Sequence, residues 1–174
     1  GRENLLEEMP PFLGGGNMIS DVRTEGFTCA ELPAKFEAGT QAIVEVVGLG
    51  AAVDYLSGIG MANVRAHEHD ITVHALGALR SRFGDDIVIH GSTDASVRGA
   101  TISFAYRDVH PHDVSQVLDQ RNVCVRAGHH CAKPLMRLLG ANATVRASFY
   151  LYNTPAEADV LCDALAEAGD FFTL

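Results

Sequence analysis

The nine residues RAGHHCAKP at positions 126–134 indicate a strand that passes through a short loop into a helix. Residues 123–126 are suited to a strand, the run 128–131 to a loop, and Pro134 to the first turn of a helix. Cys131 lies in this loop among two histidines, a lysine and an arginine. Cationic neighbours favour the thiolate, which is the nucleophilic form of cysteine. The loop therefore predicts a reactive thiol, and the alternative is a loop cysteine without a role.

Outward from this loop, hydrophobic spacing predicts alternating helices and strands. Strands are expected at 87–89, 101–106, 123–126 and 144–150, and helices at 64–83, 111–120, 134–139 and 155–168. The last helix has a capping box, with Thr154 before the first turn and Glu157 three residues later, and Gly169 is expected to end it. This order predicts an α+β layer in which helices pack on a small mixed or antiparallel sheet.

The N-terminal third of the chain has a different character. Turn-forming residues are frequent from 10 to 40, where three glycines follow one another at 14–16 and residues 17–23 are suited to a short strand. Apolar spacing predicts a largely buried helix at 41–56, with Gly48 and Gly50 used for close packing. We therefore expect residues 1–57 to be the tail of another domain with a linking helix, and residues 58–174 to be a small domain.

Composition excludes several classes of protein. The 174 residues carry a net charge of −9 with scattered basic residues, which argues against a nucleic-acid-binding or membrane-binding surface. No apolar run is long enough to cross a membrane. The four cysteines have no C-x-x-C spacing, so a disulfide framework is not expected. Free thiols in a reducing cytoplasm are the expectation.

Three further features suggest binding functions. Arg126 and Arg146 lie on predicted strands of otherwise apolar or small residues, where each needs a partner. A bidentate substrate carboxylate and an internal salt bridge are equally good candidates for that partner. Gly39 and Thr40 form a turn before a helix, suited to a phosphate, although an ordinary helix cap is the simpler interpretation.

Histidines add a weaker signal near the same loop. His112, in the run HPHD at 110–113, precedes or begins a helix and is suited to metal binding or acid–base chemistry. A zinc site built from His112, His129, His130 and Cys131 has acceptable ligand types. Its spacing matches no known closed zinc site, so a stand-alone zinc domain is the less favoured alternative.

Four motifs together give a resemblance to a known family. RAGHHC at 126–131, RASFYLYNT at 146–154, FEAGT at 36–40 and PPFLGGGNMI at 10–19 resemble the C-terminal part of SufS-type cysteine desulfurases. These enzymes use pyridoxal 5'-phosphate (PLP) and belong to the class V aminotransferase group. The resemblance implies the small C-terminal domain of a PLP fold-type I enzyme, with a remnant of the large domain at the N-terminus.

The resemblance also implies roles for individual residues. Cys131 corresponds to the nucleophile that takes sulfur from L-cysteine as a persulfide and leaves L-alanine. Arg146, with Arg126 close by, corresponds to the clamp for the substrate carboxylate. Gly39 and Thr40 correspond to a loop that reaches the cofactor phosphate across a homodimer interface. His112 matches a position used by members that pass sulfur to a zinc-containing SufU-type carrier.

One departure from the family is large. The lysine that binds PLP belongs to a motif with no counterpart here, because neither Lys35 nor Lys133 matches it. We therefore expect a fragment that is inactive alone, taken from an enzyme that supplies sulfur for iron–sulfur cluster assembly through a SufU- or SufE-type acceptor. The alternatives are a selenocysteine lyase, which the same pocket would support, and a non-catalytic module that docks a sulfur carrier.

Overall fold

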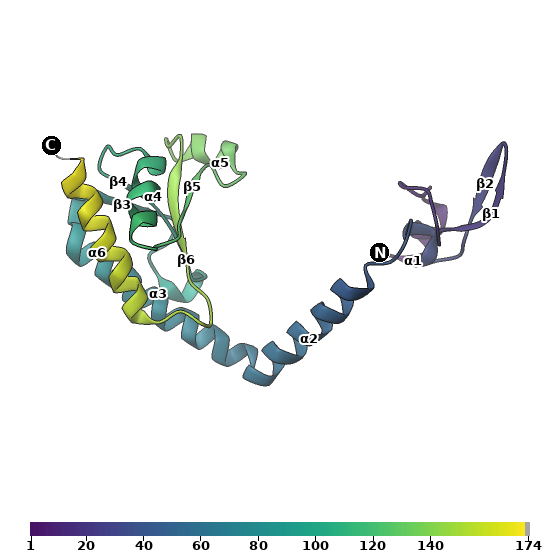
Figure 1. Ribbon diagram of the computed structural model, residues 1–174, viewed down its shortest axis with the longest axis horizontal. Coiled ribbons are helices and arrows are strands. Elements are labelled where there is room, and N and C mark those ends of the chain that lie inside the picture. The colour runs from purple at the N-terminus through teal and green to yellow at the C-terminus, as the bar shows by residue number, and fades with distance from the viewer. Residues whose placement is uncertain (173–174) are drawn as a thin grey trace. The chain divides into compact units, whose positions relative to one another are not determined.

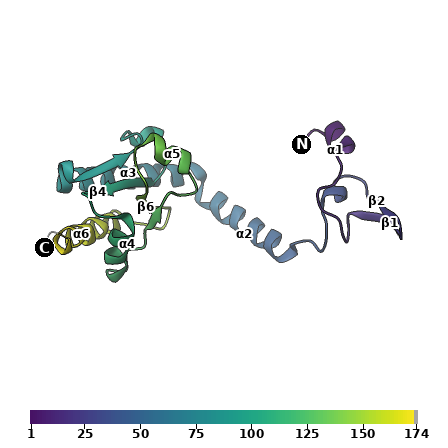
Figure 2. The same ribbon diagram turned by 90° about the horizontal axis from the view of Figure 1, so that it is seen from above.

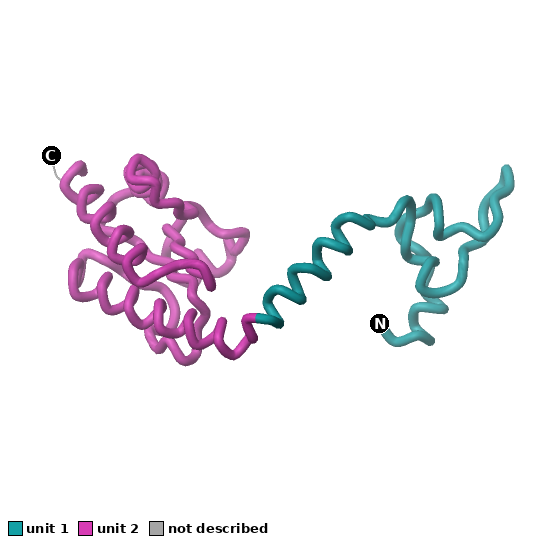
Figure 3. Tube along the Cα trace, turned by 60° about the horizontal axis from the view of Figure 1, so that its bottom comes forward, with its two compact units in different colours: residues 1–58 teal, residues 59–174 magenta. Residues whose placement is uncertain are grey.

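A computed structural model describes residues 1–172. The chain divides into two compact units, Gly1–Gly58 and the segment that follows from Ile59, and each is described by itself (Figure 3). Unit 1 contains a short helix, a two-stranded antiparallel hairpin, a 3-10 turn and a long helix. Their bounds are α1 Glu3–Glu8, β1 Ile19–Arg23, β2 Gly26–Cys29, η1 Ala34–Phe36 and α2 Ile43–Ile59.

Helix α2 differs from the prediction in its burial. A helix forms where one was expected, but none of its residues is buried, and Val44 is 79% and Tyr55 64% exposed. Its apolar side chains are spread around the helix rather than gathered in one stripe, and unit 1 offers little to cover them. The prediction of close packing at Gly48 and Gly50 is also wrong, because an added Cβ would meet nothing within 4 Å at either.

Unit 2 is an α+β layer built on one four-stranded antiparallel sheet (Figures 1 and 2). The strand order is β3-β4-β6-β5, so neighbours in the sheet are not always neighbours in sequence. The bounds are α3 Met61–Phe83, η2 Gly84–Asp86, β3 Ile87–His90, η3 Ala95–Val97, β4 Thr101–Tyr106, α4 Pro111–Gln120, β5 Arg126–Gly128, α5 Lys133–Leu138, β6 Thr144–Ser148 and α6 Pro155–Phe171.

The two faces of this sheet have different environments. Burial alternates along β4, where Ile102, Phe104 and Tyr106 join a core with α3, α4 and α6. The residues between them point to the opposite face, because successive side chains of a strand alternate. Ser103 and Arg146 lie opposite each other in register on that second face. The helices therefore cover one face, and the other carries polar side chains such as Ser103 and Arg146 beside the smaller apolar pair Val88 and Ala105.

Several boundaries differ from the sequence prediction by one to three residues, among them those of β5 and α6. Strand β5 begins at Arg126 rather than at 123, because the Val123 N–H donates to the Leu118 carbonyl and so completes the end of α4. Helix α6 begins with the predicted capping box but continues through Gly169 to Phe171.

No single helix among residues 1–172 is long and apolar enough to span a membrane. The adjacent segments Ile43–Ile59 and Met61–Asp86 satisfy the length and composition criteria only jointly, as a bent pair.

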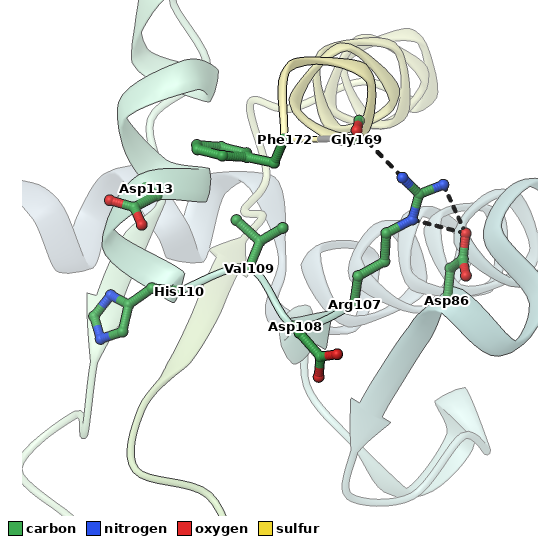
Figure 4. Close-up of a pocket in the computed structure, with 8 residues that line it drawn as sticks. All are labelled: Asp86, Arg107, Asp108, Val109, His110, Asp113, Gly169 and Phe172. Atoms are coloured by element: carbon green, nitrogen blue, oxygen red, sulfur yellow. Dashed lines mark hydrogen bonds and ion pairs between the residues drawn. The ribbon is translucent and has the colours of Figure 1, made fainter. Parts of the chain in front are cut away.

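Gly169 allows close packing instead of ending its helix. The Arg107 guanidinium donates to the Gly169 carbonyl and also binds the Asp86 carboxylate (Figure 4). A methyl group on Gly169 would collide with the hydroxyl of Tyr106, which is 2% exposed. This contact explains why a glycine occurs inside a helix, where it normally costs about 1 kcal/mol relative to alanine.

Gly169→Ala is expected to lower the free energy of unfolding by about 1–2 kcal/mol, because overpacking a buried site outweighs the gain in helix propensity. Gly77→Ala is the matched control, since Gly77 is an exposed residue of α3 with nothing near its missing Cβ. That control is expected to be neutral or stabilising. Urea unfolding followed by circular dichroism measures both, and equal stabilisation by the two variants would contradict the packing role of Gly169.

Candidate active site

Two arginines face each other on the open side of the sheet. Arg126 is the first residue of β5 and Arg146 lies in the middle of β6, and the two are directly paired in the register. Directly opposed residues of antiparallel strands point to the same face, with Cβ atoms about 5 Å apart. Like charges so close repel each other, so a negatively charged group beside them is stabilising.

No acidic side chain within residues 1–172 fills that place. Neither Arg126 nor Arg146 forms an ion pair with a described Asp or Glu. The Nε of Arg146 is buried without a hydrogen-bond partner. The internal salt bridge that sequence analysis left open is therefore absent from the part of the chain that the structure describes, and the pair can bind a carboxylate from outside.

The Cys131 thiol lies next to this pair. Cys131 is exposed, and its Sγ is 4.0 Å from Nη2 of Arg126. The loop between β5 and α5 has only four residues, 129–132. Within it, the backbone N–H of Cys131 donates to Nδ1 of His129 at 3.2 Å, and that of Ala132 donates to the His129 carbonyl at 2.8 Å. The sulfur is thus held in a short loop with a positive charge facing it.

His130 connects the loop to the sheet. Its Nε2 lies 2.9 Å from Oγ1 of Thr144, the first residue of β6. Burial lowers the pKa of His130, the positive charge of Arg146 lowers it further, and a hydrogen-bonding interaction with the Thr144 backbone opposes the shift. The imidazole is therefore neutral at neutral pH, which avoids a third positive charge beside the arginines.

The predicted phosphate turn lies in unit 1. Gly39 has a φ of +89°, and its N–H donates to the Gly15 carbonyl at 3.0 Å. A Cβ on Gly16 would lie 2.8 Å from the Cα of Gly39, so the two segments approach as closely as glycine allows. Thr40 follows directly and is exposed. A hollow beside this turn is lined by Gly16, Asn17, Gly39, Thr40, Gln41 and Ile43.

His112 lies at the start of α4. Its ring stacks on that of His110, with centroids 5.3 Å apart and planes inclined by 16°. The His112 N–H donates to Nδ1 of His110, which caps the helix. The side chain of His112 is exposed. No group of three or more His, Cys, Asp or Glu side chains in the described part of the chain is arranged to hold a metal ion.

Sequence reasoning missed two polar residues of the open face. Thr144 is fully buried, and His90 has a buried Nε2 without a partner. The register runs from His90 to Ser103 and on to Arg146, so a polar row crosses the sheet. His90 ends the otherwise apolar strand β3, and Thr144 begins β6, where polar and apolar residues alternate; these patterns were the available signals. Their neighbours depend on strand order, which the sequence pattern does not specify.

Comparison with known proteins supports a single family. Residues 1–161 match the family described as Aminotransferase class-V. A probable cysteine desulfurase from Streptomyces coelicolor is 54% identical over 99% of this chain and 41% of its own length. A cysteine desulfurase from Haloferax volcanii is 47% identical over 99% of this chain and 40% of its own length. The chain thus spans about two fifths of the length of these relatives.

Solved structures agree with the fold. The cysteine desulfurase CsdA from Escherichia coli superposes with a TM-score of 0.88 at 34% identity, over 98% of this chain and 41% of that one. The apo cysteine desulfurase from Thermococcus onnurineus gives the same TM-score and identity, over 98% and 42%. The predicted α+β fold, that of part of a PLP fold-type I cysteine desulfurase, is confirmed.

Proposed function

Because the chain belongs to the class V aminotransferase family, we propose that it forms the sulfur-accepting and substrate-binding part of a PLP-dependent cysteine desulfurase. The observation that carries the proposal is the position of the exposed Cys131 thiol beside two arginines that form no ion pair with any described acidic side chain. Transfer of sulfur from L-cysteine requires a thiol that attacks the substrate sulfur and a group that holds the substrate carboxylate nearby. We assign residues 1–57 to the tail of the large domain and 58–174 to the small domain.

The residues present fit part of a PLP site. The exposed Thr40 hydroxyl, in the turn shaped by the Gly16–Gly39 contact, is suited to the cofactor phosphate. Covalent attachment of PLP has no suitable lysine here. The Lys35 side chain already donates hydrogen bonds to the carbonyls of Leu6 and Glu7. Lys133 begins α5, two positions after the nucleophile. We propose that the attachment lysine comes from a part of the enzyme outside this sequence. The many exposed apolar side chains of α2 support that view, because apolar side chains spread around a helix are normally covered.

The chemistry follows from the positions of the side chains. Arg146 and Arg126 hold the carboxylate of L-cysteine and so orient its sulfur. The Cys131 sulfur attacks the substrate sulfur, an S–S bond forms, and the C–S bond breaks. Bound PLP supplies the electron sink for the pair released from that bond. Protonation at carbon gives L-alanine, and the enzyme retains a persulfide on Cys131.

The same proposal extends to partners and compartment. We infer a SufS-type enzyme that works as a homodimer and supplies sulfur for iron–sulfur cluster assembly through a SufU- or SufE-type acceptor. The four cysteines Cys29, Cys124, Cys131 and Cys162 are unpaired in the structure, which supports a reducing, cytoplasmic setting.

The test is product analysis of the full-length protein after incubation with L-cysteine. Stoichiometric alanine, together with a Cys131 peptide heavier by one sulfur atom, would support the proposal. A visible absorption band of bound PLP in the same sample would show that the attachment lysine is present. If the protein holds PLP and binds a sulfur carrier but makes neither alanine nor persulfide, it is a docking module and the proposal fails.

His112→Ala is expected to lower the carrier-stimulated rate of alanine formation by about 10-fold and to lower the carrier-free rate far less. The reason is that His112 is exposed at the start of α4 and offers an imidazole to a zinc-containing carrier. Gln116→Ala, on the exposed side of the same helix, is the matched control. An equal loss in both rates would assign His112 to basal catalysis and contradict the proposed transfer role.

A further inference from the structure

The backbone of the nucleophile loop adopts an unusual conformation. His130 has a φ of +53° and Cys131 a φ of +60°, so two consecutive residues with side chains occupy the left-handed region. Residues other than glycine enter this region at a cost, and they persist there only when surrounding contacts hold them. The contacts that hold this loop therefore determine where the Cys131 sulfur lies.

Some of those contacts lie inside the loop and others lead to the sheet. The bonds from the N–H groups of Cys131 and Ala132 both go to His129, so they lie inside the loop and move with it. The long contact of 4.0 Å from Arg126 Nη2 to Cys131 Sγ leads to strand β5. The bond between His130 Nε2 and Thr144 Oγ1 instead leads from the loop to strand β6. Thr144 is 0% exposed and is paired in register with Gly128, the last residue before the loop. The hydroxyl is thus an anchor point fixed by the sheet.

We propose that the buried Thr144 hydroxyl, through its hydrogen bond to His130, positions the Cys131 thiol for attack on the substrate sulfur. This inference rests on the proposed function, since it concerns the step in which the persulfide forms. Thr144 is a positioning residue that acts through His130 and does not touch the substrate. The neighbouring Arg146 binds the carboxylate from the same strand, so β6 sets the positions of both the substrate and the nucleophile.

Burial alone does not explain why residue 144 is a threonine. Valine has nearly the same volume and would bury more apolar surface in a site that is fully closed to solvent. A hydroxyl in such a site is costly unless it is hydrogen-bonded, and the imidazole of His130 is that partner. Removing the imidazole therefore leaves the buried Thr144 hydroxyl unpaired, and removing the hydroxyl leaves the half-buried His130 without its bond to the sheet.

The test uses the full-length, PLP-loaded protein with Thr144→Val and Thr144→Ser. Thr144→Val keeps the volume and removes the hydroxyl, whereas Thr144→Ser keeps the hydroxyl. Thr144→Val is expected to slow persulfide formation in single turnovers by about 10- to 100-fold, the size of effect that a misplacement of about 1 Å produces, with the KM for L-cysteine unchanged. Thr144→Ser is expected to retain most of the wild-type rate.

A measurement made without substrate tests whether the substitution loosens the nucleophile loop itself. Hydrogen exchange at the amides of residues 129–132 is expected to rise in Thr144→Val and not in Thr144→Ser, while exchange in α6 stays constant in both. A double-mutant cycle with His130→Phe adds a second check, because two residues acting through one bond give non-additive effects. The double variant is then expected to be no slower than the slower single variant.

Each outcome supports or overturns the inference. If wild-type protein forms no persulfide, the proposed function itself fails, whatever the variants do. If wild-type forms it and Thr144→Val is equally fast, the positioning role is overturned. A loss of L-cysteine binding parallel to the loss of rate, a Thr144→Ser variant as slow as Thr144→Val, or multiplied effects in the double variant would overturn it too.

Discussion

Cys131→Ser in the full-length protein is expected to lower the rate of alanine formation from L-cysteine by about 10³-fold or more, because the group that accepts the sulfur is lost. No persulfide is then expected at position 131. Cofactor and substrate binding are expected to persist, because the Cys131 side chain is exposed and supports no other part of the fold. Alanine is measured by chromatography and the persulfide by peptide mass after alkylation.

Cys124→Ser is the matched control for that experiment. Cys124 is exposed like Cys131 and lies just before β5, but no described arginine hydrogen-bonds to it. Its replacement is expected to leave turnover within about two-fold of wild type. Cys162 is 2% exposed, and burial raises the pKa of its thiol to about 11, so it offers no thiolate at neutral pH. A persulfide found on Cys124 in the Cys131→Ser protein, with turnover retained, would contradict the assignment of the nucleophile.

Elements with local signals were predictable from the sequence. Helix α4 occupies the predicted residues 111–120, because Pro111 at its first position and apolar spacing both act within a few residues. The start of α6 was predictable for the same reason, since its capping box is closed by Thr154 and Glu157 alone. The candidate thiol and arginines were found because their chemistry is visible in the residue types.

Features that depend on distant residues were not predictable. Gly169 was expected to end α6, and only the packing of Tyr106 against it shows why a glycine is needed within the helix. The burial of α2 was predicted from its composition, yet burial requires a surface to pack on, which the composition of one helix does not report. Thr144 was overlooked because its contact to His130 follows from the order of strands in the sheet.

Substitutions at Arg146 are expected to separate substrate binding from stability. Arg146→Met removes a guanidinium that has no acidic partner among residues 1–172 and whose Nε is buried unpaired. Two charge-assisted hydrogen bonds to a carboxylate are worth about 3–5 kcal/mol, so the KM for L-cysteine is expected to rise by about 10²- to 10⁴-fold. The unfolding temperature is expected to stay the same or to rise, because a buried unpaired polar group is removed.

A second variant and a second ligand test whether Arg146 acts on the substrate carboxylate. Arg146→Lys keeps the positive charge and loses the planar pair of donors, so its KM is expected to fall between those of wild type and Arg146→Met. Cysteamine lacks the carboxylate of cysteine, and its affinity as a competitive ligand is expected to be nearly the same in wild type and Arg146→Met. Equal weakening of both ligands would mean that Arg146 acts on the whole pocket. Weakening confined to L-cysteine would identify the carboxylate as the group that the two opposed arginines bind.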